Sequence, residues 1–265
     1  MTFFSLGSGS CGNCYYISTD TDAIIIDCGV GINCFKRTVR NYGLKIGHVK
    51  GILITHDHSD HVKAAGKVSD QYHLPVYATP AVHSGIDSRW QAATKVPKEN
   101  RRNIQFGETF TLGPFAITPF PIPHDASENT GYHIVCGDVR LTLMTDVGKA
   151  TDEVKSYIAK STHLILESNY DVQMLSNGPY PTILKQRISC GTGHLSNTQA
   201  ATALAENMTD QLKNVWLCHL SADNNRPEIA QKTMTDVLRQ HGVEVGQQLT
   251  IEPLKRKEPS GPYQL

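Results

Sequence analysis

A short cluster of potential metal ligands constrains this chain more than any other stretch. It reads Thr55-His56-Asp57-His58-Ser59-Asp60-His61 and directly follows the apolar residues 51–54. Such a run predicts a buried strand, and side chains two residues apart on its extended end point the same way. Asp60 and His61 enter the next turn and reach the position of a second metal ion. Because the chain holds only 12 histidines, three of them here indicate a loop that binds two metal ions.

A site for two metal ions needs about three ligands for each ion and a group that bridges them. Further ligands should therefore lie at other strand ends, and three candidates follow apolar runs later in the chain: His124, Asp146 and His219. Histidine and carboxylate side chains suit divalent transition metals, and sheets of this kind carry their functional loops at strand ends. We expect two divalent ions, Zn²⁺ or Mn²⁺, to be bound here.

Composition sets limits on the class of protein. The chain has 265 residues with 25 basic and 25 acidic side chains, so any nucleic-acid binding must be local. The apolar runs are too short for a membrane span and the N-terminus lacks a signal-peptide pattern, which predicts a cytoplasmic protein without a membrane partner. Seven scattered cysteines indicate reduced thiols. We expect a single domain over residues 1–254 and a polar, frayed C-terminal tail over 255–265.

The alternation of short apolar runs with turn residues predicts the strands. They are expected at 3–6, 15–18, 23–27, 49–54, 75–78, 106–112, 115–120, 132–136, 139–144, 163–167 and 215–219. Helical spacing and capping residues predict helices at 35–42, 62–72, 80–92, 152–160, 196–207 and 227–241. Two β-rich halves, each followed by helices, predict an α+β protein with two packed sheets flanked by helices, a four-layer αββα sandwich.

A turn rich in glycine and serine follows the first predicted strand. Its candidate substrate-binding residues are Gly7, Ser8, Gly9, Ser10, Gly12 and Asn13. The turn matches G-x-G-x-x-G formally, but a β-rich stretch follows it, so the helix that a dinucleotide site needs is missing. Two interpretations remain open. The turn is either an ordinary hairpin connection or a nest of backbone N–H groups that binds a phosphate.

Several motifs together resemble the YycJ/WalJ group of bacterial metallo-β-lactamase-fold proteins. The pattern H-x-H-x-D-H at 56–61 is similar to the signature of that fold. The resemblance extends over residues 1 to about 225 and includes the opening Phe-x-Ser-Leu-Gly-Ser-Gly-Ser-x-Gly-Asn-Cys, Thr145-Asp146-Val147-Gly148, Glu167-Ser168-Asn169-Tyr170-Asp171, Gly193-His194-Leu195-Ser196-Asn197 and His219-Leu220-Ser221. One departure is Tyr170, where the group's pattern has histidine.

The resemblance implies a metal-dependent phosphodiesterase or nuclease, specifically a 5′-to-3′ exonuclease that acts on nucleic acid, with DNA favoured over RNA. It assigns one ion to His56, His58 and His124, and the other to Asp60, His61 and His219, with Asp146 as the bridge. It also places Asp57 beside the attacking water, where its carboxylate would accept a proton. The sequence leaves the oligomeric state open.

Glu167 and His194 are the remaining catalytic candidates. In transfer-RNA 3′-processing nucleases, which this segment also resembles, a glutamate supports a histidine at the start of a helix. The leaving oxygen of a phosphodiester needs a proton, and a histidine held by a carboxylate supplies it. The competing interpretations are a capping or surface role for Glu167 and a structural role for His194.

Other functions use the same residue types. A thioester or lactone hydrolase, or a hydrolase of small cyclic nucleotides or phosphodiesters, would have the same ligands and differ in pocket shape. A non-catalytic metal-stabilised module is disfavoured, because a structural zinc site closes its shell with four ligands and needs no bridging Asp146. Transfer-RNA processing is disfavoured because no inserted arm rich in glycine and basic residues is present.

Overall fold

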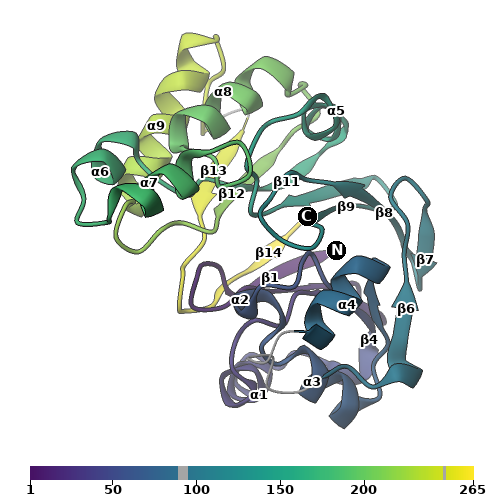
Figure 1. Cartoon of the computed structure of the whole chain (residues 1–265). Coiled ribbons are helices and arrows are strands. Elements are labelled where there is room, and N and C mark those ends of the chain that lie inside the picture. The colour runs from purple at the N-terminus through teal and green to yellow at the C-terminus, as the bar shows by residue number, and fades with distance from the viewer. Residues whose placement is uncertain (89–94, 247–248) are drawn as a thin grey trace. The chain divides into compact units, whose positions relative to one another are not determined.

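A computed structural model describes residues 1–88, 95–246 and 249–265 (Figure 1). The chain divides into two compact units, which are described separately. Unit 1 comprises Met1–Pro119, Ala126–Thr130 and Lys255–Leu265, and unit 2 comprises Phe120–Asp125 and Gly131–Leu254.

Unit 1 is built on a mixed seven-stranded sheet with the order β14-β1-β2-β3-β4-β5-β6. Strands β14, β1, β2 and β3 pair antiparallel, and β3 to β6 pair parallel. The strands are β1 (Thr2–Gly7), β2 (Cys14–Ser18), β3 (Ala23–Ile26), β4 (Val49–Leu53), β5 (Val76–Ala78), β6 (Arg101–Asn103) and β14 (Ser260–Gln264). Strands β3 and β4 are apolar and almost wholly buried, as expected for parallel strands covered on both faces.

The helices of unit 1 lie in the connections between its strands (Figure 1). Phe35, Val68 and Val82 from three of these helices pack with strand residues Ile25 and Ile52 in one core. The elements are α1 (Ile32–Asn41), η1 (Ile46–His48), α2 (Ser59–Val62), α3 (Ala65–Tyr72), α4 (Pro80–Ser88) and η2 (Lys98–Asn100). Helix α2 begins within the histidine cluster, which fixes the backbone around His58 and His61.

The second seven-stranded sheet has the order β13-β12-β11-β10-β9-β8-β7. Strands β10 to β13 pair parallel, and β9 pairs antiparallel with β10. The strands are β7 (Phe110–Leu112), β8 (Phe115–Pro121), β9 (Thr130–Cys136), β10 (Val139–Met144), β11 (His163–Glu167), β12 (Asn214–Cys218) and β13 (Thr250–Pro253). The parallel strands bring the residues after β10, β11 and β12 to the same edge of the sheet.

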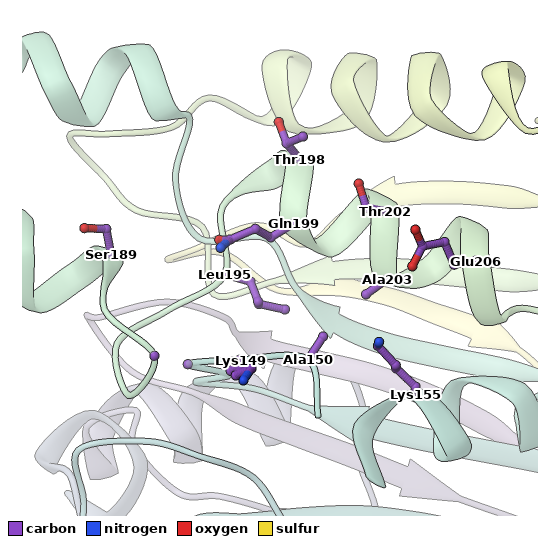
Figure 2. A pocket seen from close by; sticks show the side chains of 12 residues that line it. Lys149, Ala150, Lys155, Ser189, Leu195, Thr198, Gln199, Thr202, Ala203 and Glu206 are labelled. Atoms are coloured by element: carbon purple, nitrogen blue, oxygen red, sulfur yellow. The ribbon is translucent and has the colours of Figure 1, made fainter. Parts of the chain in front are cut away.

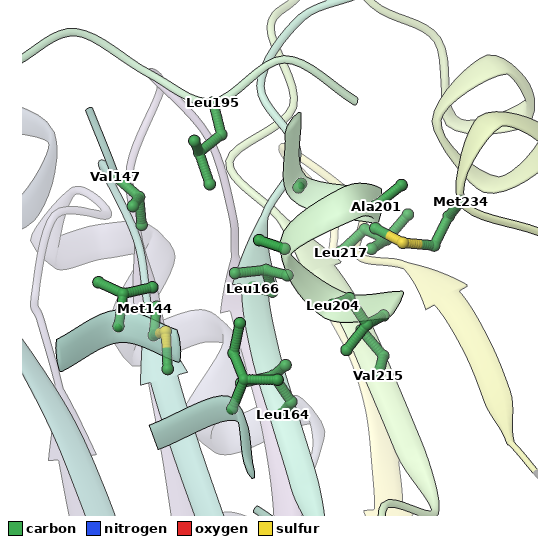
Figure 3. Packing of buried hydrophobic residues seen from close by; sticks show 14 of the residues in the cluster. Met144, Val147, Leu164, Leu166, Leu195, Ala201, Leu204, Val215, Leu217 and Met234 are labelled. Carbon is green, nitrogen blue, oxygen red and sulfur yellow. The ribbon is translucent and has the colours of Figure 1, made fainter. Parts of the chain in front are cut away.

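Helices of unit 2 bury their apolar sides against this sheet. Figure 3 shows Leu164, Leu166 and Leu217 of the strands packed with Leu204 of α8 and Met234 of α9. The helices are α5 (Asp152–Lys160), α6 (Val172–Asn177), α7 (Thr182–Ser189), α8 (Asn197–Asn207) and α9 (Pro227–Gln240). Helix α8 starts with a complete capping box, in which the side chains of Ser196 and Gln199 each accept a hydrogen bond from the other residue's backbone N–H.

The predicted α+β class is confirmed, and α5 and β11 have the predicted bounds. The helix predicted at 62–72 is instead two helices, α2 and α3, and residues 89–92 of the helix predicted at 80–92 lie outside the described residues. The sequence did not predict β6, α6, α7, β13 or β14. Most of these are short and polar, so they lack an apolar pattern that would mark them. All seven cysteines are free, as predicted.

The prediction of a frayed tail over residues 255–265 is wrong for Ser260–Gln264, which form strand β14. Strand β14 pairs antiparallel with β1, with Thr2 opposite Gln264 and Phe3 opposite Tyr263. The rings of Phe3 and Tyr263 stack with their centroids 5.7 Å apart. Backbone pairing along an edge strand does not need an apolar pattern, which explains why polar composition misled the prediction. In the described part of the chain no helix is both long and apolar enough to cross a membrane.

Candidate metal centre

Three of the residues that follow buried strands have unusual backbone conformations. Asp27 after β3, Asp146 after β10 and His219 after β12 have φ angles of 59°, 55° and 53°. Aspartate and histidine enter this left-handed region more often than most non-glycine residues, at a conformational cost that the surrounding buried structure offsets.

The predicted ligands of unit 1 form a tight group of imidazoles. The ring centroid of His56 is 4.6 Å from that of His58 and 4.1 Å from that of His61. His56 and His61 are fully buried. The Thr55 hydroxyl lies 3.0 Å from Nδ1 of His56, which points to Nε2 as the ligand atom of that ring. Neutral imidazoles are the form that binds metals.

Asp27 orients His61. Its carboxylate Oδ2 lies 2.7 Å from Nδ1 of His61 and accepts a hydrogen bond of 2.8 Å from the Thr55 hydroxyl. Burial raises the pKa of Asp27, although the neighbouring His61 imidazole acts in the opposite direction. A carboxylate on one ring nitrogen fixes the imidazole's orientation and presents the other nitrogen as a ligand. The sequence analysis missed Asp27, although it follows an apolar run in the same way as Asp146.

The glycine- and serine-rich turn uses most of its polar groups internally. The Asn13 side chain accepts a hydrogen bond from the Gly9 amide, and its Nδ2 lies 2.9 Å from Nε2 of His61. The amides of Ser8, Gly9, Gly12 and Asn13 all donate within the protein. These contacts favour the hairpin interpretation and make the buried Asn13 a neighbour of a predicted ligand. Phosphate binding by the turn stays a prediction, and of its predicted residues Ser10 is exposed.

Asp57 is held by a segment that the sequence did not indicate. Its carboxylate accepts hydrogen bonds from the Ser127 hydroxyl at 2.9 Å and from the Ser127 amide at 3.2 Å. Gly85 of α4 packs directly against this pair, because a Cβ there would lie 2.3 Å from Oδ2 of Asp57 and 2.6 Å from Oγ of Ser127. Ser127 lies in an irregular loop, where periodicity gives no signal.

We expect Gly85→Ala to lower the turnover number by about tenfold, because the added methyl group displaces the Asp57 carboxylate that we predict to accept a proton. This is part of the ~10²- to 10⁴-fold that general acid–base catalysis typically contributes. Turnover of a nucleic-acid substrate and of bis-p-nitrophenyl phosphate would be compared. Both should fall alike, since both reactions need the attacking water. A variant that keeps full turnover on both substrates would contradict the assigned role of Asp57.

In unit 2, Asp146 lies among three histidines. Its Oδ1 is 3.6 Å from Nε2 of His124, 3.7 Å from Nδ1 of His194 and 3.6 Å from Nδ1 of His219. Its other oxygen accepts a 2.7 Å hydrogen bond from the Thr145 hydroxyl. Asp146 is only 2% exposed. His124, Asp146 and His219, which the sequence placed at separate strand ends, are therefore adjacent in the structure.

Glu167 is fully buried and connects the loops of this group. Its Oε1 lies 2.8 Å from Nδ1 of His194 and 3.2 Å from Nδ1 of His219, while Oε2 accepts hydrogen bonds from the amides of Val147 and Leu195. The predicted contact between Glu167 and His194 is present. The carboxylate holds two imidazoles and two backbone segments, so the capping or surface interpretation of Glu167 is wrong.

The Glu167–His194 pair favours charge separation. Burial alone would raise the pKa of Glu167, but the His194 and His219 imidazoles outweigh it and the pKa is lowered. Burial alone would likewise lower the pKa of His194, but the carboxylates of Glu167 and Asp146 outweigh it and the pKa is raised. A histidine with a raised pKa carries the proton that a general acid must supply.

His124 completes the unit 2 group. Its Nδ1 lies 3.0 Å from the carbonyl oxygen of Gly193, which fixes the tautomer with Nε2 as the ligand atom. The neighbouring Asp125 accepts a 2.6 Å hydrogen bond from Nε of Arg187, and this ion pair ties α7 to the His124 loop.

The donor sets of both units fit transition-metal ions. Imidazole and carboxylate groups at short mutual distances are the ligands that Zn²⁺ and Mn²⁺ use. Asp146, Glu167, His194 and His219 could hold an ion by distance alone. However, the 2.8 Å separation between Glu167 and His194 is a hydrogen-bond length, and Oε2 is taken by backbone amides. These two residues are therefore better suited to positioning and proton transfer than to coordination.

Similarity to known proteins identifies the family of this chain. The family model described as "Beta-lactamase superfamily domain" matches residues 22–219. The chain belongs to the β-lactamase superfamily. Within this superfamily, it is 35% identical to "Exodeoxyribonuclease YycJ" of Bacillus anthracis, over 97% of each chain. It is 32% identical to "Exodeoxyribonuclease WalJ" of Streptococcus pneumoniae serotype 2, covering 91% of this chain and 89% of that protein.

A solved structure confirms the predicted fold of this superfamily member. The metallo-beta-lactamase fold protein YhfI of Bacillus subtilis superposes with a TM-score of 0.71 over 98% of both chains. Sequence identity is 17%, so this likeness concerns the fold. The relatives at 35% and 32% identity confirm the resemblance to the YycJ/WalJ group that the motifs indicated.

Proposed function

We propose that this chain is a metal-dependent exonuclease that shortens DNA in the 5′-to-3′ direction. The observation that carries the proposal is the contact of the buried Glu167 with His194, whose Nδ1 lies 3.7 Å from Asp146. It supplies a proton donor next to a predicted metal ligand, which the cleavage of an unactivated phosphodiester needs. The names of the two relatives, both exodeoxyribonucleases, support DNA as the substrate.

We propose that two divalent ions, Zn²⁺ or Mn²⁺, are bound by the seven predicted ligands. His56, His58 and His124 would bind one ion, Asp60, His61 and His219 the other, and Asp146 both. Membership of the superfamily and the close grouping of donors within each unit support this assignment. Bound ions of this kind activate water and neutralise charge on a phosphate.

The protein's own residues would divide the remaining work. Asp57, held by Ser127, would accept the proton of the attacking water. His194 would donate a proton from Nε2 to the leaving oxygen, because its Nδ1 is engaged by Glu167. Asp27 and Glu167 would keep the imidazoles of His61 and His219 in fixed orientations.

Within residues 1–88, 95–246 and 249–265, no specific contact favours the other candidate functions. Thioester, lactone and small cyclic-nucleotide hydrolysis would use the same ligands, yet a thioester, whose thiolate leaves readily, has little need of the His194 proton. We propose a cytoplasmic location.

The metal content tests this proposal directly. Wild-type protein should carry about two equivalents of transition metal, because three ligands per ion and a bridge suffice for two ions. Asp60→Ala or His219→Ala should reduce the content to about one. Elemental analysis measures the metal content. Cleavage of DNA and RNA labelled at either end, in Mn²⁺, shows which nucleic acid is the substrate and in which direction it is shortened. Cleavage that persists in chelator, by protein without metal, would refute the metal-dependent function.

A further inference from the structure

A pocket in unit 2 lies directly beside the loops that carry Asp146 and His194. It has a volume of about 490 Å³ and is formed by α5, α8, the loop after β10 and the end of α7 (Figure 2). Pockets of roughly 300–1,000 Å³ accommodate small organic ligands, and one nucleotide unit falls in this range. The reaction assigned above does not use this pocket.

The position of the pocket is fixed by tight packing between two loops. A Cβ on Gly148 would lie 2.5 Å from the carbonyl oxygen of Gly191, so the loop after Asp146 and the loop before His194 touch through their backbones. Both glycines line the pocket, as does Leu195. Leu195 adjoins His194, and Gly148 is two residues from Asp146, at most roughly 7 Å along an extended chain. The loops that carry Asp146 and His194 therefore also form part of the pocket wall.

The chemistry of the lining fits a phosphorylated sugar. Lys149 and Lys155 supply two positive charges, and Glu206 supplies one negative charge. Figure 2 shows Thr198, Thr202 and Glu206 along one side of α8, while Lys155 extends from α5 on the opposite wall. Apolar groups of Ala150, Leu195 and Ala203 complete the lining. Two lysines with neighbouring hydroxyl groups attract a phosphate, and the apolar surface suits a sugar or base face.

We propose that this pocket binds the nucleotide unit of the substrate strand that neighbours the bond being cleaved. The proposal rests on the proposed nuclease function and names a subsite for it. None of the 12 lining residues, all within the described chain, is aromatic, so no ring is available to stack on a base. The subsite therefore recognises charge and size, and binding should depend on salt far more than on base sequence.

A binding experiment with matched variants tests the subsite. The ligand would be a fluorescein-labelled, 5′-phosphorylated, phosphorothioate-linked single strand of oligothymidine, measured by fluorescence anisotropy with the metal-loaded protein. Lys149→Gln/Lys155→Gln should raise the dissociation constant about tenfold. It should lower the slope of log Kd against log salt by about 0.7, the contribution of one single-strand phosphate. Glu206→Gln should tighten binding by about two- to threefold, because it removes a repulsive charge.

Lys160→Gln is the matched control. Lys160 lies on the same helix as Lys155 but outside the pocket, with its ammonium 4.3 Å from the centre of the Tyr157 ring. It should change the dissociation constant by less than about twofold. The proposal is overturned if the double variant binds like wild type, or if Lys160→Gln weakens binding as much as the double variant does. Thermal melting of each variant identifies a loss of folding.

Hydrolysis of bis-p-nitrophenyl phosphate separates this proposal from the proposed function. If wild-type protein binds the strand through the pocket but does not hydrolyse the small diester in Mn²⁺, the nuclease function fails and the binding result still stands. If wild-type protein hydrolyses both substrates and the double variant has an unchanged KM for DNA, the subsite fails while the function stands.

Discussion

His194→Ala is expected to lower the cleavage of DNA by about 10²- to 10⁴-fold, the usual contribution of general acid catalysis. The leaving oxygen of DNA is a poor leaving group and needs a proton, whereas p-nitrophenolate scarcely does. Hydrolysis of bis-p-nitrophenyl phosphate should therefore fall much less than cleavage of DNA. The turnover numbers of both substrates and the metal content would be measured together.

The result distinguishes three roles for His194. A selective loss on DNA with full metal content supports the proton donor. Loss of metal would make the residue a ligand, and an equal loss on both substrates would make it a structural support. Glu167→Gln should affect more than the acid, because Glu167 also contacts His219 and two backbone amides. We expect this variant to lose part of its metal as well.

Asp146→Asn is expected to reduce turnover of both substrates by at least about 10³-fold, because several kcal/mol of transition-state stabilisation depend on the ions it would bridge. The carboxylate is buried within 3.7 Å of three imidazole nitrogens, and an amide carries no charge to hold two cations. Asparagine tolerates the left-handed conformation of this position, so the fold should persist. Metal content and the melting temperature would be measured beside the two turnover numbers.

A selective effect would contradict this role of Asp146. If Asp146→Asn keeps two equivalents of metal and loses only the cleavage of DNA, then the residue assists His194 and does not bridge the ions.

The sequence predicted the parts of the site that follow apolar strands. His124, Asp146 and His219 each follow a run that must be buried, and parallel pairing then brings the loops after β10 and β12 to one edge. The same logic would have found Asp27. Ser127 and the contact of Asn13 with His61 were missed because they depend on partners that are distant along the chain, 70 residues to Asp57 and 48 residues to His61.

The limits of the fold prediction have the same origin. Helix α7 has no buried residue, so the amphipathic pattern that marked α5 is absent. Strand β14 is stabilised by its pairing with β1, which composition does not reveal. The prediction succeeded where burial dictates residue type and failed where tertiary contacts alone decide the structure.

The left-handed backbone at Asp27, Asp146 and His219 has a consequence for how such sequences diverge. A protein of this fold that no longer needed the site could place glycine at these positions without the conformational cost, whereas Asp27 and Asp146 are kept by the buried hydrogen bonds that their carboxylates accept. Glycine at two or three of these positions would therefore mark a descendant that has given up catalysis, even where its histidine cluster survives.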